Sequence, residues 1–194
     1  MFLEHQIENH GGRIEVICGS MFSGKTEELI RRMNRAKIAK QKCLMFKPKI
    51  DTRYDAERVV SHNQTKVEAI VVEDSKSILK LAQKIDVIGI DEAQFFDESL
   101  SDVCDYLADK GIRVICAGLD IDSFGKPFGP MPNLIAKAEY VTKVHAICVD
   151  CGQLAHHSFR TASEEQLVLL GDVSEYEALC RVCFNDKFNK KYNL

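Results

Sequence analysis

The sequence of 194 residues contains no long hydrophobic run, and this absence sets a first limit on its function. No apolar stretch approaches the roughly 20 residues that a membrane-spanning helix needs, so we expect no membrane partner. The chain also has no excess of positive charge: the formal net charge is −3, which gives no reason to expect nucleic acid as a partner. No internal repeat and no Pro/Gly-rich linker is present. The polar, acidic N-terminal stretch is unlike a signal peptide, and we therefore expect a cytoplasmic protein.

The eight cysteines fall into two groups by their spacing. Four lie singly in apolar stretches and are expected to be reduced core thiols: Cys18, Cys43, Cys104 and Cys116. The others form two C-x-x-C pairs, Cys148 with Cys151 and Cys180 with Cys183. Four thiolates suit tetrahedral zinc in a closed, structural site, and a loop between the pairs would have its two ends tied together by the metal. Reduced core pairs or a redox C-x-x-C are the alternatives. His156 and His157 could replace a thiolate, but two complete pairs make them unnecessary, so we expect them at the surface.

Apolar runs that alternate with amphipathic segments predict an α/β fold with a mostly parallel sheet flanked by helices. The predicted strands span residues 13–18, 43–46, 67–72, 86–91 and 112–118. The predicted helices span residues 26–39, 75–84, with Ser75 as N-cap, and 97–109. The first helix places Leu29, Ile30 and Met33 on one face and a solvated face with Arg31, Arg32 and Arg35 on the other. We divide the chain into an α/β domain, 1–141, and a zinc-binding domain, 142–194.

The segment GSMFSGKT matches the phosphate-binding pattern G-x-x-x-x-G-K-[ST] at every fixed position. It follows a predicted strand and opens a predicted helix, which is the context that this pattern requires. Glycines let the backbone wrap around phosphates, and successive N–H groups supply positive potential. We expect Lys25 to reach the β- and γ-phosphates and Thr26 to bind magnesium. The predicted phosphate-binding residues are Gly19, Ser20, Met21, Phe22, Ser23, Gly24, Lys25 and Thr26.

A second chemical signal is the acidic pair Asp91-Glu92 at the end of the predicted strand 86–91. An acid at this place in phosphate-loop proteins holds magnesium, and we assign that role to Asp91. Glu92 points the other way, toward an acceptor, where a carboxylate can take the proton of an attacking hydroxyl or water. The pair therefore fits hydrolysis and phosphoryl transfer equally, and an exposed acidic turn is the plain alternative.

Five segments in this order resemble type II thymidine kinases, the cellular and bacterial kind: GSMFSGKTEELIRR, FKPKIDTRY, IDEAQFF, AGLDIDSFGKPFGP and VTKVHAIC. The likeness runs from residue 12 to about 184. It implies a RecA-like core and a zinc-tethered loop, called a lasso, that closes over thymidine. It also implies transfer of the γ-phosphate of ATP, with Mg2+, to the 5′-hydroxyl of thymidine and of deoxyuridine.

The resemblance also implies roles for individual residues. Glu92 would be the catalytic base, Asp91 and Gln94 would border the nucleotide, and Asp51 and Arg53 would lie beside the ATP phosphates. Ser158 stands where the family usually has a threonine near the thymine methyl group. The implied acceptor pocket comprises Met21, Phe95, Leu119, Phe124, Phe128, Ser158, Leu167, Val168, Leu169, Leu170, Gly171 and Tyr176. Feedback inhibition by thymidine triphosphate and a homodimer or homotetramer are implied too.

Three other functional hypotheses are alternatives to a thymidine kinase. A zinc-lid nucleoside monophosphate kinase would carry its cysteines mid-chain and a loop that reads more like GxPGxGKGT. A RecA-like ATPase with a nucleic-acid-binding zinc module would favour a basic appendage, whereas residues 142–194 carry several acidic residues around 164–177. A GTPase would explain the D-x-x-G match of residues 122–125, but no guanine-reading N-K-x-D follows.

Overall fold

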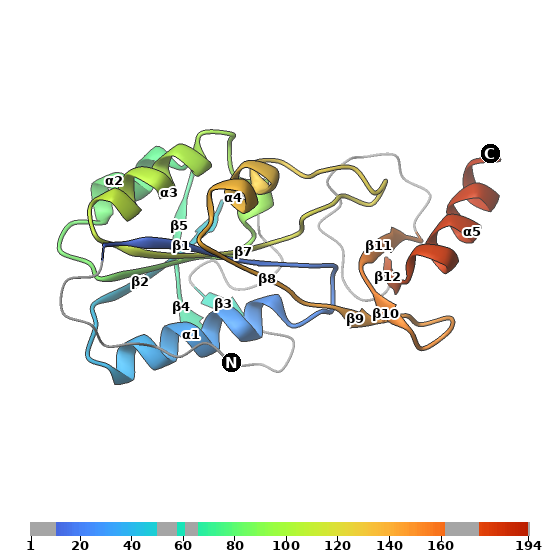
Figure 1. The fold of residues 1–194 in the computed structure, drawn as a ribbon, viewed down its shortest axis with the longest axis horizontal. Helices are drawn as coiled ribbons and strands as arrows, with labels where there is room; N and C mark the ends of the chain where they lie inside the picture. Colours follow the sequence, from blue (N-terminus) through green and yellow to red (C-terminus); the bar gives the residue numbers. More distant parts are fainter. Residues whose placement is uncertain (1–10, 50–57, 61–65, 162–174, 194) are drawn as a thin grey trace.

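The computed structural model describes residues 11–49, 58–60, 66–161 and 175–193. Its main element is a parallel sheet in the order β5-β2-β6-β7-β1-β8. Helix α1 (Lys25–Ile38) covers one face, and α2 (Lys76–Leu81), α3 (Leu100–Asp109) and α4 (Met131–Lys137) cover the other (Figure 1). The strands are β1 (Arg13–Cys18), β2 (Cys43–Pro48), β5 (Ile70–Val72), β6 (Val87–Ile90), β7 (Arg113–Gly118) and β8 (Tyr140–Lys143). The predicted fold class is therefore confirmed.

Burial on both faces explains why the central strands are apolar almost throughout. All four residues of β6 are buried, as are five of the six in β7. On one face α1 packs Leu29, Ile30 and Met33 into a cluster with Ile17 and Ile115. On the other face the helices contribute a second cluster, which includes Ile78, Leu100, Val103, Met131 and Leu134. Packing of these faces, more than intrinsic propensity, holds the short helices in place.

The prediction that three arginines of the first helix face solvent is wrong for one of them. Arg31 and Arg35 are exposed, but Arg32 is buried. Its Nη1 donates to Glu15 Oε2 at 2.9 Å, and its Nε donates to Glu28 Oε1 at 2.8 Å. Glu15 on β1 also accepts hydrogen bonds from Arg113 on β7, so an ion-pair network joins α1 to two strands.

Several predicted elements differ from the structure in their limits. The predicted strand 67–72 is two strands: β4 (Lys66–Glu68) pairs antiparallel with β3 (Arg58–Val60), and β5 joins the main sheet. Ser75 precedes α2 but makes no capping hydrogen bond, because its Oγ donates to Asp97 Oδ1 at 2.8 Å. Asp74 accepts from the N–H of Ser77 instead. The helix predicted from residue 97 begins at Leu100.

A smaller assembly, which we call the C-terminal lobe, consists of the described residues between 146 and 192. It contains the antiparallel pairs β9 (Ala146–Ile147) with β10 (Leu154–Ala155) and β11 (His157–Arg160) with β12 (Tyr176–Leu179), followed by α5 (Arg181–Tyr192). The lobe lies beyond the carboxyl ends of β1 and β8 (Figure 1). The predicted division at residues 141 and 142 falls within β8, which pairs with β1; two domains remain a prediction. Within the described residues, no helix is long and apolar enough to cross a membrane.

Candidate functional site

The predicted phosphate loop forms the turn between β1 and α1. Gly19 has φ 147° and Gly24 has φ 83°, a backbone region that favours glycine. A Cβ on Gly19 would lie 2.1 Å from the carbonyl oxygen of Val144, so a side chain does not fit there. Lys25 Nζ and Ser23 Oγ donate to the carbonyl oxygen of Ser20 at 2.8 and 2.7 Å. The lysine ammonium group therefore lies at the loop, where phosphate oxygens could replace this carbonyl.

The predicted magnesium ligands come together although 65 residues separate them in the chain. Thr26 Oγ1 lies 3.4 and 3.3 Å from the two carboxylate oxygens of Asp91. Asp91 is buried directly after β6, and its N–H donates to the carbonyl of Phe46 on β2 at 3.0 Å. A hydroxyl beside a carboxylate is a donor set that suits Mg2+, so these residues fit the ion.

Glu92, the predicted base, adopts a left-handed backbone conformation, with φ 51° and ψ 42°. This conformation costs a non-glycine residue about 1–2 kcal/mol, and such residues cluster at functional sites. Gln94 Nε2 lies 2.5 Å from Glu92 Oε2 and donates to it, while Gln94 Oε1 accepts from the N–H of Leu119 at 2.9 Å. Gln94 is 2% exposed. Its amide therefore connects the carboxylate of Glu92 to the backbone that follows β7.

Two glycines lie so close to Gln94 that a side chain at either position would not fit. A Cβ on Gly118 would lie 2.7 Å from Gln94 Oε1, and a Cβ on Gly129, where φ is 47°, would lie 2.3 Å from the Gln94 carbonyl oxygen. The nucleotide contact predicted for Gln94 remains a prediction, but sequence reasoning missed its bond to Glu92.

Of the seven pocket residues that the structure describes, three lie on the connection between β7 and α4, and Phe95 lies on the 3-10 helix η1 (Ala93–Phe95). Phe95 and Phe128 meet edge to face with their ring centroids 5.6 Å apart. Asp122 Oδ1 accepts from the N–H groups of Phe124 and Lys126, both at 2.9 Å. An aspartate that binds the backbone two residues ahead is a turn-forming device, so the D-x-x-G match has a structural explanation.

The phosphate loop also touches the C-terminal lobe. The N–H of Met21 donates to Ser158 Oγ at 2.9 Å, and Ser158 is buried in β11. Lys143 Nζ forms an ion pair with Asp120 Oδ2 at 2.6 Å, which links β8 to the segment after β7. Tyr176 is buried in β12, with the guanidinium carbon of Arg160 5.7 Å from its ring centre. The predicted site residues Asp51, Arg53, Leu167, Val168, Leu169, Leu170 and Gly171 lie outside the described residues.

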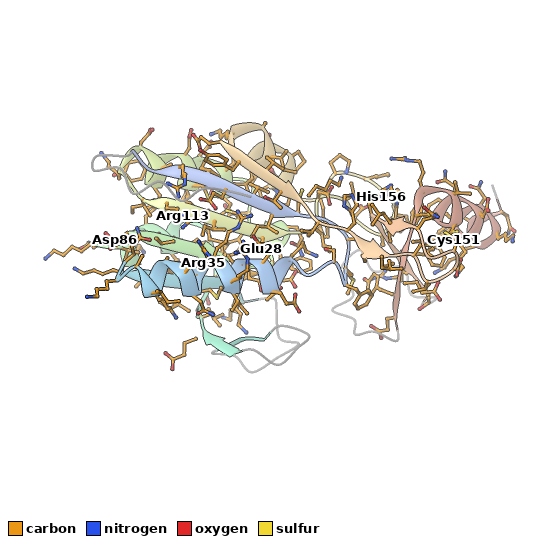
Figure 2. All side chains as sticks on the ribbon, turned by 60° about the horizontal axis from the view of Figure 1, so that its bottom comes forward. Glu28, Arg35, Asp86, Arg113, Cys151 and His156 are labelled. Carbon is orange, nitrogen blue, oxygen red and sulfur yellow. The ribbon has the colours of Figure 1, made fainter. Side chains whose placement is uncertain are left out.

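The four predicted metal ligands form one cluster in the lobe. Sγ atoms of Cys148, Cys151, Cys180 and Cys183 all lie within 4.8 Å of one another. A tetrahedral zinc site with Zn–S bonds of about 2.3 Å places its sulfurs about 3.8 Å apart, and the Cys151 and Cys180 sulfurs are 3.6 Å apart. Figure 2 shows Cys151 beside α5, at the end of the molecule opposite Asp86. The geometry fits zinc.

Backbone N–H groups favour the thiolate at this cluster. Burial alone would raise the pKa of the Cys148 thiol, but hydrogen bonds from the backbone at Cys180, Cys151 and Asp150 outweigh it and lower the pKa to about 6. His157, expected at the surface, is instead buried and stacks on Phe184 with centroids 4.4 Å apart. The sulfur cluster therefore needs no histidine.

Comparison with known proteins decides the family. The model of the family described as thymidine kinase matches residues 12–184. This chain belongs to the thymidine kinase family. It is 60% identical over 186 residues to a thymidine kinase of Bacteroides thetaiotaomicron, covering 95% of this chain and 94% of that protein. A thymidine kinase of Porphyromonas gingivalis is 55% identical over 188 residues, covering 94% of this chain and 92% of that protein.

A more distant likeness concerns the fold only. The solved structure of the genome packaging NTPase B204 from Sulfolobus turreted icosahedral virus 2 in complex with sulfate has a TM-score of 0.46 and 18% identity, and covers 71% of this chain and 76% of that chain. It adds nothing to the assignment of this thymidine kinase family member. The family match ends at residue 184, so it leaves out most of α5, which continues to Tyr192.

Proposed function

We propose that this member of the thymidine kinase family transfers the γ-phosphate of ATP to the 5′-hydroxyl of thymidine, and of deoxyuridine, to give the nucleoside monophosphate and ADP. Family membership supports the substrate. The observation that carries the mechanism is the placement of Asp91 against Thr26 of the phosphate loop, with Glu92 next to it in a left-handed turn. A triphosphate site and a carboxylate base would thus lie side by side.

The phosphate loop and Lys25 would hold the triphosphate. Binding of ATP would exchange the hydrogen bond from Lys25 Nζ to the Ser20 carbonyl for bonds to the β- and γ-phosphates. Thr26 and Asp91 would hold Mg2+, which when bound neutralises charge on the phosphate oxygens. Asp51 and Arg53 are proposed to lie beside the same phosphates, and Gln94 to border the nucleotide.

Glu92 would accept the proton of the 5′-hydroxyl as that oxygen attacks the γ-phosphorus in line. General-base assistance of this kind is worth about 10²–10⁴ in rate. The base must be deprotonated and correctly aimed, and the bond from Gln94 Nε2 to Glu92 Oε2 holds the carboxylate in one orientation. We therefore treat Gln94 as a positioning residue for the base.

The acceptor would bind between the aromatic residues after β7 and the C-terminal lobe. Met21, Leu119, Phe95 and the other proposed pocket residues offer apolar walls that suit a thymine ring. The segment 167–171 is proposed to read the pyrimidine edge through its main chain. The four cysteines would hold zinc, which ties together the two ends of the loop between the cysteine pairs; that zinc-anchored loop would exclude water from the transferred phosphoryl group. Feedback inhibition by thymidine triphosphate, a homodimeric or homotetrameric state and a cytoplasmic location are part of the proposal.

Incubation with γ-labelled ATP and a panel of nucleosides and nucleoside monophosphates tests the reaction. Label on thymidine supports the kinase, label on a nucleoside monophosphate indicates a nucleotide kinase, and only free phosphate indicates an ATPase. In Glu92→Gln we expect thymidine phosphorylation to fall by about 10²-fold or more while ATP binding persists. Glu98→Gln, the same change at an exposed residue, is the matched control. Near wild-type turnover in Glu92→Gln would remove Glu92 from the base role.

A further inference from the structure

Helix α5 carries an aromatic face that extends beyond the part of the chain matched by the family. Phe184, Phe188 and Tyr192 follow one another at intervals of four residues, the spacing of neighbours on one helix face. The centroids of Phe184 and Phe188 lie 5.4 Å apart, and those of Phe188 and Tyr192 lie 4.6 Å apart. The family match ends at Phe184, so Phe188 and Tyr192 lie beyond the matched residues.

Charged side chains hold the helix in one orientation on the lobe. Lys187 Nζ donates to Glu177 Oε2 at 2.6 Å and to Asp150 Oδ1 at 2.9 Å. One turn further on, Lys191 Nζ donates to the carbonyl oxygen of Arg160 at 2.9 Å. The three acceptors lie on β12, on the turn that follows β9, and on β11. These contacts fix which face of α5 points toward the rest of the molecule.

That face meets Phe124, which lies on the connection between β7 and α4. The centroid of Phe124 is 6.3 Å from that of Phe188, nearly perpendicular at 86°, and 6.0 Å from that of Tyr192. Next to it, a Cβ on Gly125 would lie 3.8 Å from the Phe184 ring, in ordinary contact. The backbone of Phe124 is held by Asp122. Its backbone is thus held by Asp122, and its ring contacts the end of α5.

We propose that Phe188 and Tyr192 are positioning residues that determine how tightly the pocket holds the nucleoside, by keeping the ring of Phe124 in place. This inference rests on the proposed function, in which Phe124 lines the acceptor pocket. Edge contacts between aromatic rings have a preferred geometry, so losing them frees a half-buried phenylalanine to leave its position. We expect the effect mainly on the acceptor side, because the phosphate loop makes its hydrogen bonds to the lobe at Ser158 and Ala155, which lie on β11 and β10.

Tyr192→Ala in the full chain is the decisive variant, because Tyr192 is 39% exposed and its loss leaves the core of the lobe intact. We expect the KM for thymidine to rise about three- to tenfold, the range that loss of an aromatic pair supports, with the KM for ATP unchanged. Tyr192→Phe should restore the wild-type value, because the ring contact needs no hydroxyl. Phe188→Leu, which keeps an apolar side chain in the lobe, should also raise the KM for thymidine. Lys190→Ala, at an exposed residue two positions from Phe188 and so on the other side of the helix, is the control.

Two further measurements separate positioning from folding. Zinc content and melting temperature of Tyr192→Ala should match the wild type. An unchanged KM for thymidine in Tyr192→Ala, or a rise in both KM values together with a fall in melting temperature, would overturn the inference while leaving the kinase activity standing. Absence of label transfer to thymidine by the wild type would remove the proposed function and this inference with it.

Discussion

The hydrogen bond from Gln94 to Glu92 can be tested without disturbing the other bond that Gln94 makes. Gln94→Glu keeps an oxygen to accept the N–H of Leu119 but replaces the donor that lies 2.5 Å from Glu92 Oε2 with a second carboxylate oxygen. Two carboxylates this close, one at the buried position 94 and one at the half-buried Glu92, do not both ionise readily, so the pair binds a proton at higher pH than a lone glutamate does. In the variant, the base is therefore protonated over part of the range where the wild type is active.

The magnitude follows from the bond that is lost. A hydrogen bond to a charged group contributes about 1.5–3 kcal/mol, so kcat near neutral pH should fall by about ten- to a hundredfold. Transfer of label from ATP to thymidine, measured over a series of pH values, gives the decisive readout. We expect the variant to regain activity as the pH rises, because the shared proton is then lost. A variant with wild-type kcat and an unshifted pH profile would refute the positioning role, and an equal loss of activity at every pH would indicate a structural effect instead.

Two further predictions concern stability and metal content. Glu15→Gln should lower the free energy of unfolding by about 3 kcal/mol, because it leaves the buried Arg32 and the partly buried Arg113 without their carboxylate. Burial opposes ionisation of Glu15, but Arg113 and Arg13 outweigh it and hold its pKa below the ordinary 4.5. This stabilisation is therefore complete above pH 4.5 and is lost as the pH falls below it, so denaturation curves of wild type and variant should converge in acid; a constant difference at all pH values would contradict this. Cys148→Ser should reduce bound zinc from about one equivalent to a small fraction by elemental analysis, and retention of a full equivalent would exclude Cys148 as a ligand.

Contiguous patterns were the part of this structure that the sequence could predict. The phosphate loop is set by neighbouring residues whose backbone conformation is local, such as Gly19 and Gly24. Strand β6 was predictable because both faces of it are covered, which leaves an unbroken apolar run. Each of these features is decided within a short stretch of chain.

What the sequence left out depends on distant partners. Arg32 has the pattern of a solvent-facing residue on α1, and only the position of Glu15 on another element shows that it is buried. Strand β8 escaped prediction because it lies at the edge of the sheet, where Tyr140 and Val141 are exposed and no apolar run is needed. Helix α5 was not predicted because its inner face consists of widely spaced aromatic residues, of which only Phe184 is buried, and because the cysteine spacing dominates the same stretch.

The candidate site also combines features that local sequence predicts with features that depend on distant residues. The roles proposed for Asp91 and Glu92 follow from the end of one strand and need only neighbouring residues, whereas the contact between the phosphate loop and the C-terminal lobe does not follow from local sequence. Ser158 was assigned to the thymine methyl group by resemblance alone, whereas its hydroxyl accepts the N–H of Met21. A threonine, the residue usual in the family, would keep that acceptor. The hydroxyl group, which serine and threonine share, therefore accepts a hydrogen bond from the phosphate loop. A substitution at position 158 that removes this hydroxyl should disturb both the phosphate loop and the acceptor pocket.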